Sequence, residues 1–114
     1  MTMQQSFKMK SDRFRKVRGG TAKLLSVCCS KCGSHLLVYQ KDGVGKLKRC
    51  YLDRIHAPPD LESLQRNPNV RVPRDLPPLA CRQCGTLVGT PMIHHSGRLA
   101  FRLWPGAIEK KRLS

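Results

Sequence analysis

Hydrophobic and polar residues alternate along four stretches of the chain. They form two pairs, 36–39 with 47–52 and 86–88 with 99–104, and a glycine-containing turn lies between the members of each pair. Alternation with a period of two places apolar side chains on one face of a strand and polar side chains on the other. The sequence therefore predicts two β-hairpins whose outer faces carry Lys and Arg.

The two hairpins belong to an internal repeat. A shift of 52 positions, from Cys29 to Cys81, aligns Cys-x-x-Cys-Gly in both halves, and eleven residues later it aligns Gly-Lys-Leu with Gly-Arg-Leu. Each Cys-x-x-Cys-Gly turn is called a knuckle below. We predict a small mainly-β domain, stabilised by zinc, in which each half repeat joins a knuckle to a hairpin.

Prolines separate the two halves. Residues 57–78 hold six of the eight prolines of the chain, which excludes a central strand or a long helix in this connector. One short helix still fits there, with Asp60 as its cap and its end near Asn67. The domain is expected over 23–108, with halves 23–56 and 79–108, between a basic flexible arm at 1–22 and a basic tail at 109–114.

Four cysteines have the spacing of a metal site. Two residues between the cysteines of a pair let a tight turn direct both sulfurs at one ion, and the following glycine permits a positive φ. A disulfide within either pair would close a very short loop and restrain little of the chain, so two disulfides are the weaker alternative. The predicted ligands of one structural zinc ion are Cys29, Cys32, Cys81 and Cys84.

Two further cysteines lie outside this pattern. Cys28 could replace Cys29 as a ligand, but only Cys29 aligns with Cys81 in the repeat. Cys50 is expected to be a small core residue.

The histidines give weaker signals. His94 and His95 lie at the second hairpin turn, where a His pair can bind metal or stack on a base, although an exposed turn is the more common outcome. His35 follows the first knuckle closely enough to support the metal site, and His56 begins the connector without an evident partner.

Positive charge is extreme for 114 residues. Lys and Arg number 22 against seven acids, which gives a formal net charge of +15. A polyanionic partner explains this charge most easily, nucleic acid before membrane. The first hairpin also carries Arg54. The candidate phosphate-binding residues are Lys8, Lys10, Arg13, Arg15, Lys16, Arg18, Lys46, Lys48, Arg49, Arg98, Arg102, Lys110, Lys111 and Arg112.

Two features that are rare or missing in the sequence bear on how RNA is recognised and on the compartment of the protein. Three Phe, two Tyr and one Trp offer few stacking platforms, so contacts to phosphates and to RNA shape are expected rather than base reading. We find no secretory signal and no membrane span, which favours reduced thiols in the cytoplasm. The arm at 1–22 could instead be a mitochondrial targeting segment or an idle solvated tail.

Catalysis is not expected. Four thiolates close the coordination shell of zinc, no His-x-Glu accompanies the second pair as a zinc deaminase requires, and no phosphate-binding loop is present. We therefore expect neither an enzyme nor a small-molecule substrate.

The chain resembles zinc ribbons and the zinc-bound β-tent fold of Yippee-like and cereblon-type domains. The likeness covers 27–108 at most and depends on the two knuckles and on Val88-Gly89. It implies one zinc held by the four knuckle cysteines and no shared enzymatic activity. The basic ends look more like those of small zinc-bearing ribosomal proteins.

Three functions remain open. The first is a component of the ribosome, or a factor bound to it, with rRNA and neighbouring ribosomal proteins as partners. The second is a DNA-binding or transcription-associated zinc ribbon. The third is a β-tent module that binds a peptide or a small ligand, for which Tyr39, Tyr51, Phe101 and Trp104 are the available aromatic residues.

Overall fold

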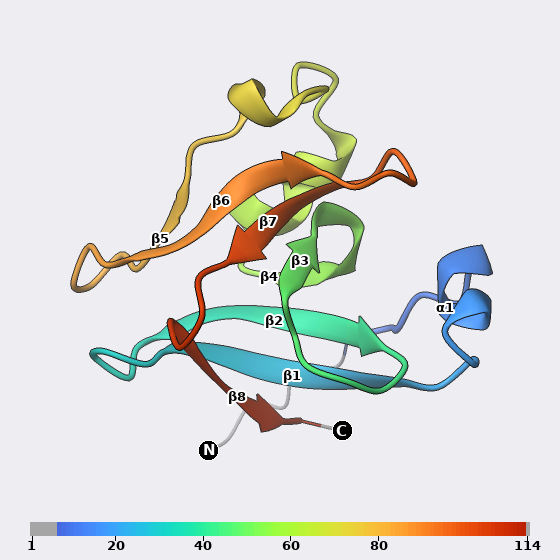
Figure 1. The fold of residues 1–114 in the computed structure, drawn as a ribbon, viewed down its shortest axis with the longest axis horizontal. Coiled ribbons are helices and arrows are strands. Elements are labelled where there is room, and N and C mark those ends of the chain that lie inside the picture. The colour runs from blue at the N-terminus through green and yellow to red at the C-terminus, as the bar shows by residue number, and fades with distance from the viewer. Residues whose placement is uncertain (1–6, 114) are drawn as a thin grey trace.

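A computed structural model describes residues 7–113 and contains two four-stranded antiparallel sheets (Figure 1). The first sheet has the strand order β4-β2-β1-β8 and the second has the order β3-β7-β6-β5. The first comprises β1 (Ala22–Cys29), β2 (His35–Asp42), β4 (Ile55–Ala57) and β8 (Ile108–Arg112). The second comprises β3 (Arg49–Tyr51), β5 (Leu79–Ala80), β6 (Leu87–Ile93) and β7 (Leu99–Leu103). The predicted small mainly-β fold is confirmed.

Short helices connect the strands. The helix predicted in the proline-rich connector is present as α2 (Pro59–Glu62) followed by the 3-10 helix η2 (Ser63–Arg66), although Pro58 and not Asp60 precedes its first residue. Two further 3-10 helices are η1 (Leu52–Arg54) and η3 (Pro73–Asp75). The helix α1 (Arg13–Val17) was not predicted.

The repeat places the strands correctly. Moving β2 by 52 positions gives 87–94, where β6 lies, and moving β3 gives 101–103, inside β7. Both knuckles are hairpin turns, since the first joins the antiparallel pair β1–β2 and the second joins β5–β6. At the knuckles, the sequence similarity of the halves therefore reflects a shared local structure.

The pairing predicted for the first hairpin is wrong. Strand β2 pairs with β1 and β4, whereas β3 crosses to the second sheet and pairs with β7. Gly43 and Gly45, both at positive φ, form the turn that carries the chain between the sheets. The second predicted hairpin is confirmed, because β6 pairs with β7 and the His94 amide donates to the Arg98 carbonyl at 2.9 Å.

The hydrophobic core lies between the sheets. Leu25 and Val27 of β1 pack there with residues of β7, where Phe101 and Leu103 are buried and Arg102 between them is exposed. This alternation confirms that Arg102, the cation of β7, lies on the outer face. A hydrogen bond also crosses the core, since the Tyr51 amide donates to the Tyr39 hydroxyl at 2.9 Å, and burial raises the pKa of Tyr39.

The amino-terminal segment packs on the body where an unpacked arm was expected. The Lys10 amide donates to Gln40 Oε1, and Phe7 contacts the ring of His56 with centroids 6.0 Å apart. Asp12 caps α1 by accepting from the Phe14 amide at 3.1 Å. Residues 7–18 are thus part of the fold, while 1–6 of the expected arm lie outside the described residues.

The carboxyl-terminal basic run forms a strand instead of a tail. Strand β8 pairs with β1 along an edge of the first sheet, with Lys110 opposite Val27 and Lys111 opposite Ser26. Charged side chains suit an edge strand because they discourage pairing with a further chain. The tail prediction was wrong for 109–112 because a run of cations does not by itself exclude a strand.

Candidate metal centre and basic surface

The two knuckles bring four sulfurs together. The Sγ atoms of Cys29, Cys32, Cys81 and Cys84 all lie within 4.8 Å of one another. Cys29 is 3.7 Å from Cys84, and Cys32 is 3.5 Å from Cys81, so both close approaches join one knuckle to the other. The predicted ligand set is therefore gathered at one point, at the end of the molecule where the two sheets converge (Figure 1).

The same backbone hydrogen bonds shape each knuckle. In the first, the Gly33 amide donates to the Cys29 carbonyl at 2.8 Å, and the Cys29 amide donates to the Ser34 carbonyl at 2.8 Å. In the second, the Gly85 amide donates to the Cys81 carbonyl at 2.8 Å, and the Cys81 amide donates to the Thr86 carbonyl at 2.9 Å. Gly33 and Gly85 have φ of +79° and +74°, which L side chains rarely adopt.

A hydroxyl supports the second sulfur of each knuckle. Ser34 Oγ lies 3.2 Å from Cys32 Sγ, and Thr86 Oγ1 lies 3.0 Å from Cys84 Sγ. Hydrogen bonds from Thr86 lower the pKa of Cys84 to about 6, and those from Ser34 lower the pKa of Cys32. Both thiols are thereby biased toward the thiolate form that binds metal.

These four sulfurs fit a tetrahedral ion. With Zn–S bonds of about 2.3 Å, the sulfurs of a regular tetrahedron are about 3.8 Å apart, close to the separations of 3.5 and 3.7 Å in the structure. Four thiolates leave no open coordination position, which is typical of structural zinc. Because each knuckle belongs to a different sheet, a bound ion would fasten the two sheets together.

The remaining cysteines lie outside this group. Cys28 is half-buried and its Sγ lies 3.8 Å from Ser26 Oγ, while its neighbour Cys29 is a member of the cluster. Cys50 is fully buried in the core, as predicted, and burial raises the pKa of its thiol to about 12. The internal repeat therefore predicted correctly that Cys29, and not Cys28, belongs to the four-cysteine group.

One predicted surface cation is buried. Arg54 has no exposed surface, and its guanidinium donates to Asp42 Oδ2 at 2.7 Å and to both carboxylate oxygens of Asp12, at 2.5 and 3.1 Å. The hydrogen bonds to Arg54 lower the pKa of Asp12 to about 2. Arg54 thus fixes the amino-terminal segment to the body instead of facing a partner.

The cluster of Arg54 with Asp12 and Asp42 could hardly be predicted from the sequence. Asp12 and Arg54 are separated by 42 positions, and neither lies in a motif. Lys41 was also missed, since its side chain is buried on β2 and donates to the Gly43 carbonyl at 3.2 Å.

Several of the predicted phosphate-binding residues donate hydrogen bonds within the fold. Lys10 donates from Nζ to Gln65 Oε1, and Arg15 Nε donates to the Gly20 carbonyl at 2.7 Å. Arg98 donates to Asp53 Oδ1 at 2.7 Å. Their charges are still near the surface, but their donors have intramolecular partners.

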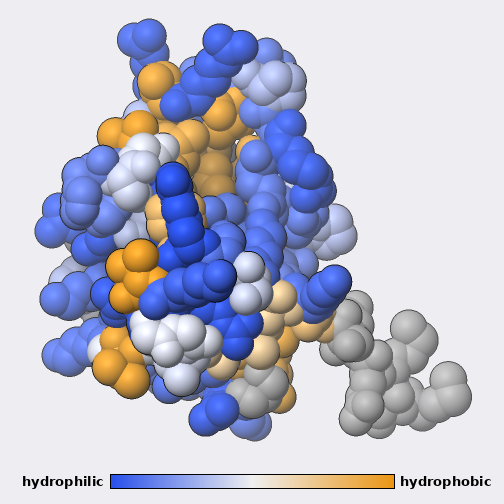
Figure 2. All heavy atoms as spheres, turned by 90° about the vertical axis from the view of Figure 1, so that its right-hand side faces the viewer, coloured by the Kyte–Doolittle hydropathy of each residue, from blue (hydrophilic) through white to orange (hydrophobic). Residues whose placement is uncertain are grey.

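The other predicted cations are mostly exposed, and many gather on one side. Figure 2 views this side, where hydrophilic residues predominate around scattered apolar ones. Arg49 and Arg102 are cross-strand neighbours on β3 and β7, and Arg18 of the helix end donates to Val44 in the loop before β3. We call this surface the basic face, which comprises Arg13, Lys16, Arg18, Lys46, Lys48, Arg49 and Arg102. Lys8, Lys110, Lys111 and Arg112 are exposed elsewhere.

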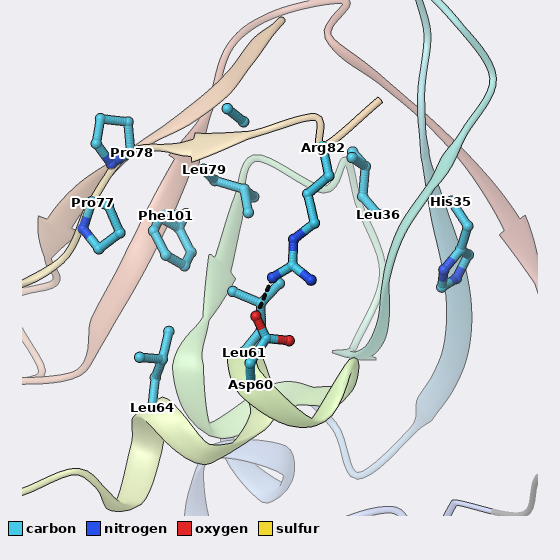
Figure 3. A pocket seen from close by; sticks show the side chains of 11 residues that line it. His35, Leu36, Asp60, Leu61, Leu64, Pro77, Pro78, Leu79, Arg82 and Phe101 are labelled. Atoms are coloured by element: carbon cyan, nitrogen blue, oxygen red, sulfur yellow. Dashed lines mark hydrogen bonds and ion pairs between the residues drawn. The ribbon is translucent and has the colours of Figure 1, made fainter. Parts of the chain in front are cut away.

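A cavity of about 320 Å³ opens between the knuckles and the connector (Figure 3). Its wall is mainly apolar, with Leu61 and Leu64 of the connector facing Leu79 and Phe101 of the second sheet. Arg82 of the second knuckle reaches across and pairs with Asp60 of α2. The ion pair ties the connector to the metal centre.

Within the described residues, no helix is long and apolar enough to cross a membrane. Comparison with protein-family models, curated proteins and solved structures finds no match for the chain.

Proposed function

We propose that this chain is a zinc-stabilised RNA-binding protein, a component of the ribosome or a factor bound to it, that contacts rRNA phosphates. The observation that carries this proposal is the distribution of charge. All seven acids lie within residues 7–113, which the structure describes, and five of them form ion pairs there with four arginines, namely Asp12 and Asp42 with Arg54, Asp53 with Arg98, Asp60 with Arg82, and Glu62 with Arg66.

In this described part of the chain, none of these five acids pairs with a cation of the basic face. The basic face draws its residues from α1, the loop before β3, and strands β3 and β7. Cations spread over several elements match a phosphate backbone, which presents negative charge along its length. Phosphate binding needs no particular base, and rRNA together with neighbouring ribosomal proteins would surround such a surface.

The zinc has a structural role in this proposal. The β-tent resemblance is supported by two sheets that meet at their knuckles, and the small core gains from a metal cross-link. The cavity beside the metal centre favours a second candidate, a β-tent module that binds a peptide or a small ligand there. That second function would be favoured if the chain bound a peptide or a small ligand at high salt and if substitutions in the cavity abolished this binding.

The test is the salt dependence of binding to a structured RNA by the zinc-loaded full chain. Lys48→Glu and Arg102→Glu should weaken binding. The plot of log affinity against log salt should also become shallower, its negative slope decreasing in magnitude by about 0.7 to 0.9 for each phosphate that the variant no longer binds. The control is Arg74→Glu, the same change at an exposed site on the connector. Equal effects of all three substitutions would contradict a localised binding face, and tighter binding to duplex DNA would favour the transcription-associated alternative.

Point substitutions serve this test better than removal of the arm. Deleting residues 1–20 would remove Asp12, which leaves the buried Arg54 with Asp42 alone. The deletion would then mix a loss of stability with a loss of phosphate binding. Membership of the particle is tested separately by sedimentation of native lysate, where co-migration with a ribosomal subunit after a high-salt wash indicates a core component.

A further inference from the structure

Planar side chains from separate segments of the chain form a row beside the basic face. The Arg98 guanidinium lies 4.0 Å from the centre of the Phe14 ring and 3.7 Å from the centre of the Tyr51 ring. His94 meets Tyr51 edge-on with centroids 5.5 Å apart, and His95 follows with its centroid 3.9 Å from that of His94. The expectation that few planar groups accompany the cations is therefore wrong at this place.

The inner part of the row has a structural explanation. Asp53 holds Arg98 in place, and the Arg98 guanidinium between Phe14 and Tyr51 fastens α1 to the second sheet. Cation–π contacts of this kind are common supports in folded proteins. This part of the row needs no ligand to account for it.

At the outer end, the turn itself holds His94, whose Nδ1 accepts from the Ser96 amide at 3.2 Å, so His95 is the ring that needs an explanation. His95 is exposed at the tip of the β6–β7 hairpin, and the row ends with its ring at the surface. Partial burial, the neighbouring His95 and the guanidinium groups of Arg49 and Arg98 lower the pKa of His94, which disfavours the charged form of that ring. A supported, exposed ring at the end of such a row is the kind of surface on which a nucleobase stacks.

Cations lie along the middle of the row, at Tyr51. Arg49 donates to the Tyr51 hydroxyl at 3.1 Å and lies opposite the exposed Arg102 in the β3–β7 pair. A nucleotide whose base stacks at the exposed end of the row would therefore have cations further along the row for its neighbouring phosphates. Proteins that bind single-stranded nucleic acid combine these two features.

We propose that the His94–His95 pair is a stacking site for an unpaired base of the bound RNA. The proposal rests on the RNA-binding function proposed above and adds a base-stacking interaction to it. Every base has a π-face, so the site selects an unpaired nucleotide and not a particular sequence. A bulged or looped nucleotide next to a helix would place its base on His95 while its phosphates meet Arg49 and Arg102.

The experiment compares two RNA hairpins, one with a single bulged adenine and one with an abasic nucleotide at the same position. The abasic RNA keeps the phosphates and lacks the base. The zinc-loaded full chain should bind the adenine RNA about tenfold more tightly, the usual effect of one stacked base. His95→Ala should abolish this difference, and His95→Tyr should preserve it because the ring is retained.

His35→Ala is the matched control, since His35 is also exposed but lies beside the first knuckle, at the other end of the molecule. This variant should keep the tenfold preference. Nuclear magnetic resonance adds a direct readout, because the ring current of a stacked base should shift the His95 ring protons upfield with the adenine RNA and not with the abasic RNA.

Each result is decisive. Equal binding of the two RNAs, or a preference that survives His95→Ala, overturns the stacking site while leaving phosphate binding intact. Failure of both RNAs to bind with a salt-dependent affinity overturns the proposed function itself, and the stacking site with it.

Discussion

Replacing the buried Arg54 should destabilise the protein far more than replacing an exposed arginine. The Arg54 side chain is 0% exposed, Asp42 is 8% exposed and Asp12 is 39% exposed. Arg54→Ala leaves the nearly buried Asp42 carboxylate without a counter-charge. Breaking a buried ion pair from one side costs about 3 to 5 kcal/mol, because the remaining charge is unsolvated.

The chain contains a matched control for this substitution. Arg66 pairs with Glu62 one helical turn away and is 61% exposed, so Arg66→Ala should change the free energy of unfolding only slightly. Urea unfolding of the zinc-saturated proteins measures both free energies. A loss of about 3 kcal/mol should lower the melting temperature by at least about 10 °C in a domain of this size.

The double variant Arg54→Met, Asp42→Asn separates charge from packing. Removing both charges should recover part of the lost stability, since no uncompensated carboxylate then remains on the buried side. The reasoning would be refuted if the unfolding free energies of Arg54→Ala and Arg66→Ala lay within about 1 kcal/mol of each other, because the buried pair would then behave like an ordinary surface pair.

Three further outcomes follow from the same structure. Cys84→Ser should abolish the binding of one zinc per chain and unfold the domain, whereas Cys28→Ser should retain the metal, as metal analysis and circular dichroism will show. The stability that separates the wild type from Asp12→Asn should stay constant between about pH 8 and pH 5. It should be lost only as pH falls from about 4 toward 2, because the buried guanidinium lowers the pKa of Asp12 to about 2; a decline already complete at about pH 5 would count against that ion pair. Gly43→Ala should destabilise more than Gly97→Ala, since both have positive φ but only the Cβ at position 43 would lie 2.9 Å from a backbone oxygen of the α1 cap. Strain alone costs about 1 to 2 kcal/mol, and equal unfolding free energies for the two variants would contradict the steric argument.

The metal centre could be predicted because its determinants are local. Two residues between cysteines fix the turn, and the repeat identifies Cys29 over Cys28 as the partner of Cys81. The second hairpin was predictable for the same reason, since its turn and both strands are adjacent in sequence. The burial of Cys50 followed from its residue type, because free cysteine is among the most buried side chains.

Long-range pairings could not be predicted in this way. Alternation at 47–52 indicates a strand with one buried face. It does not indicate which strand is its partner, and in the structure the partner is β7 and not β2. The Arg54 cluster joins charges that look like ordinary surface residues in the sequence. The row of planar side chains is likewise assembled from Phe14, Tyr51 and His94, which lie far apart along the chain.

The strand order explains why these distant pairings matter for the metal. The first half of the chain gives β3 to the second sheet, and the second half gives β8 to the first sheet. Neither half can therefore complete its own sheet or cover its own apolar face. A zinc ion at the knuckles would fasten two halves that are already interlocked by these exchanged strands, while Arg54 secures the amino-terminal segment separately. Loss of the metal should then loosen both sheets together, because each sheet depends on a strand that the other half supplies.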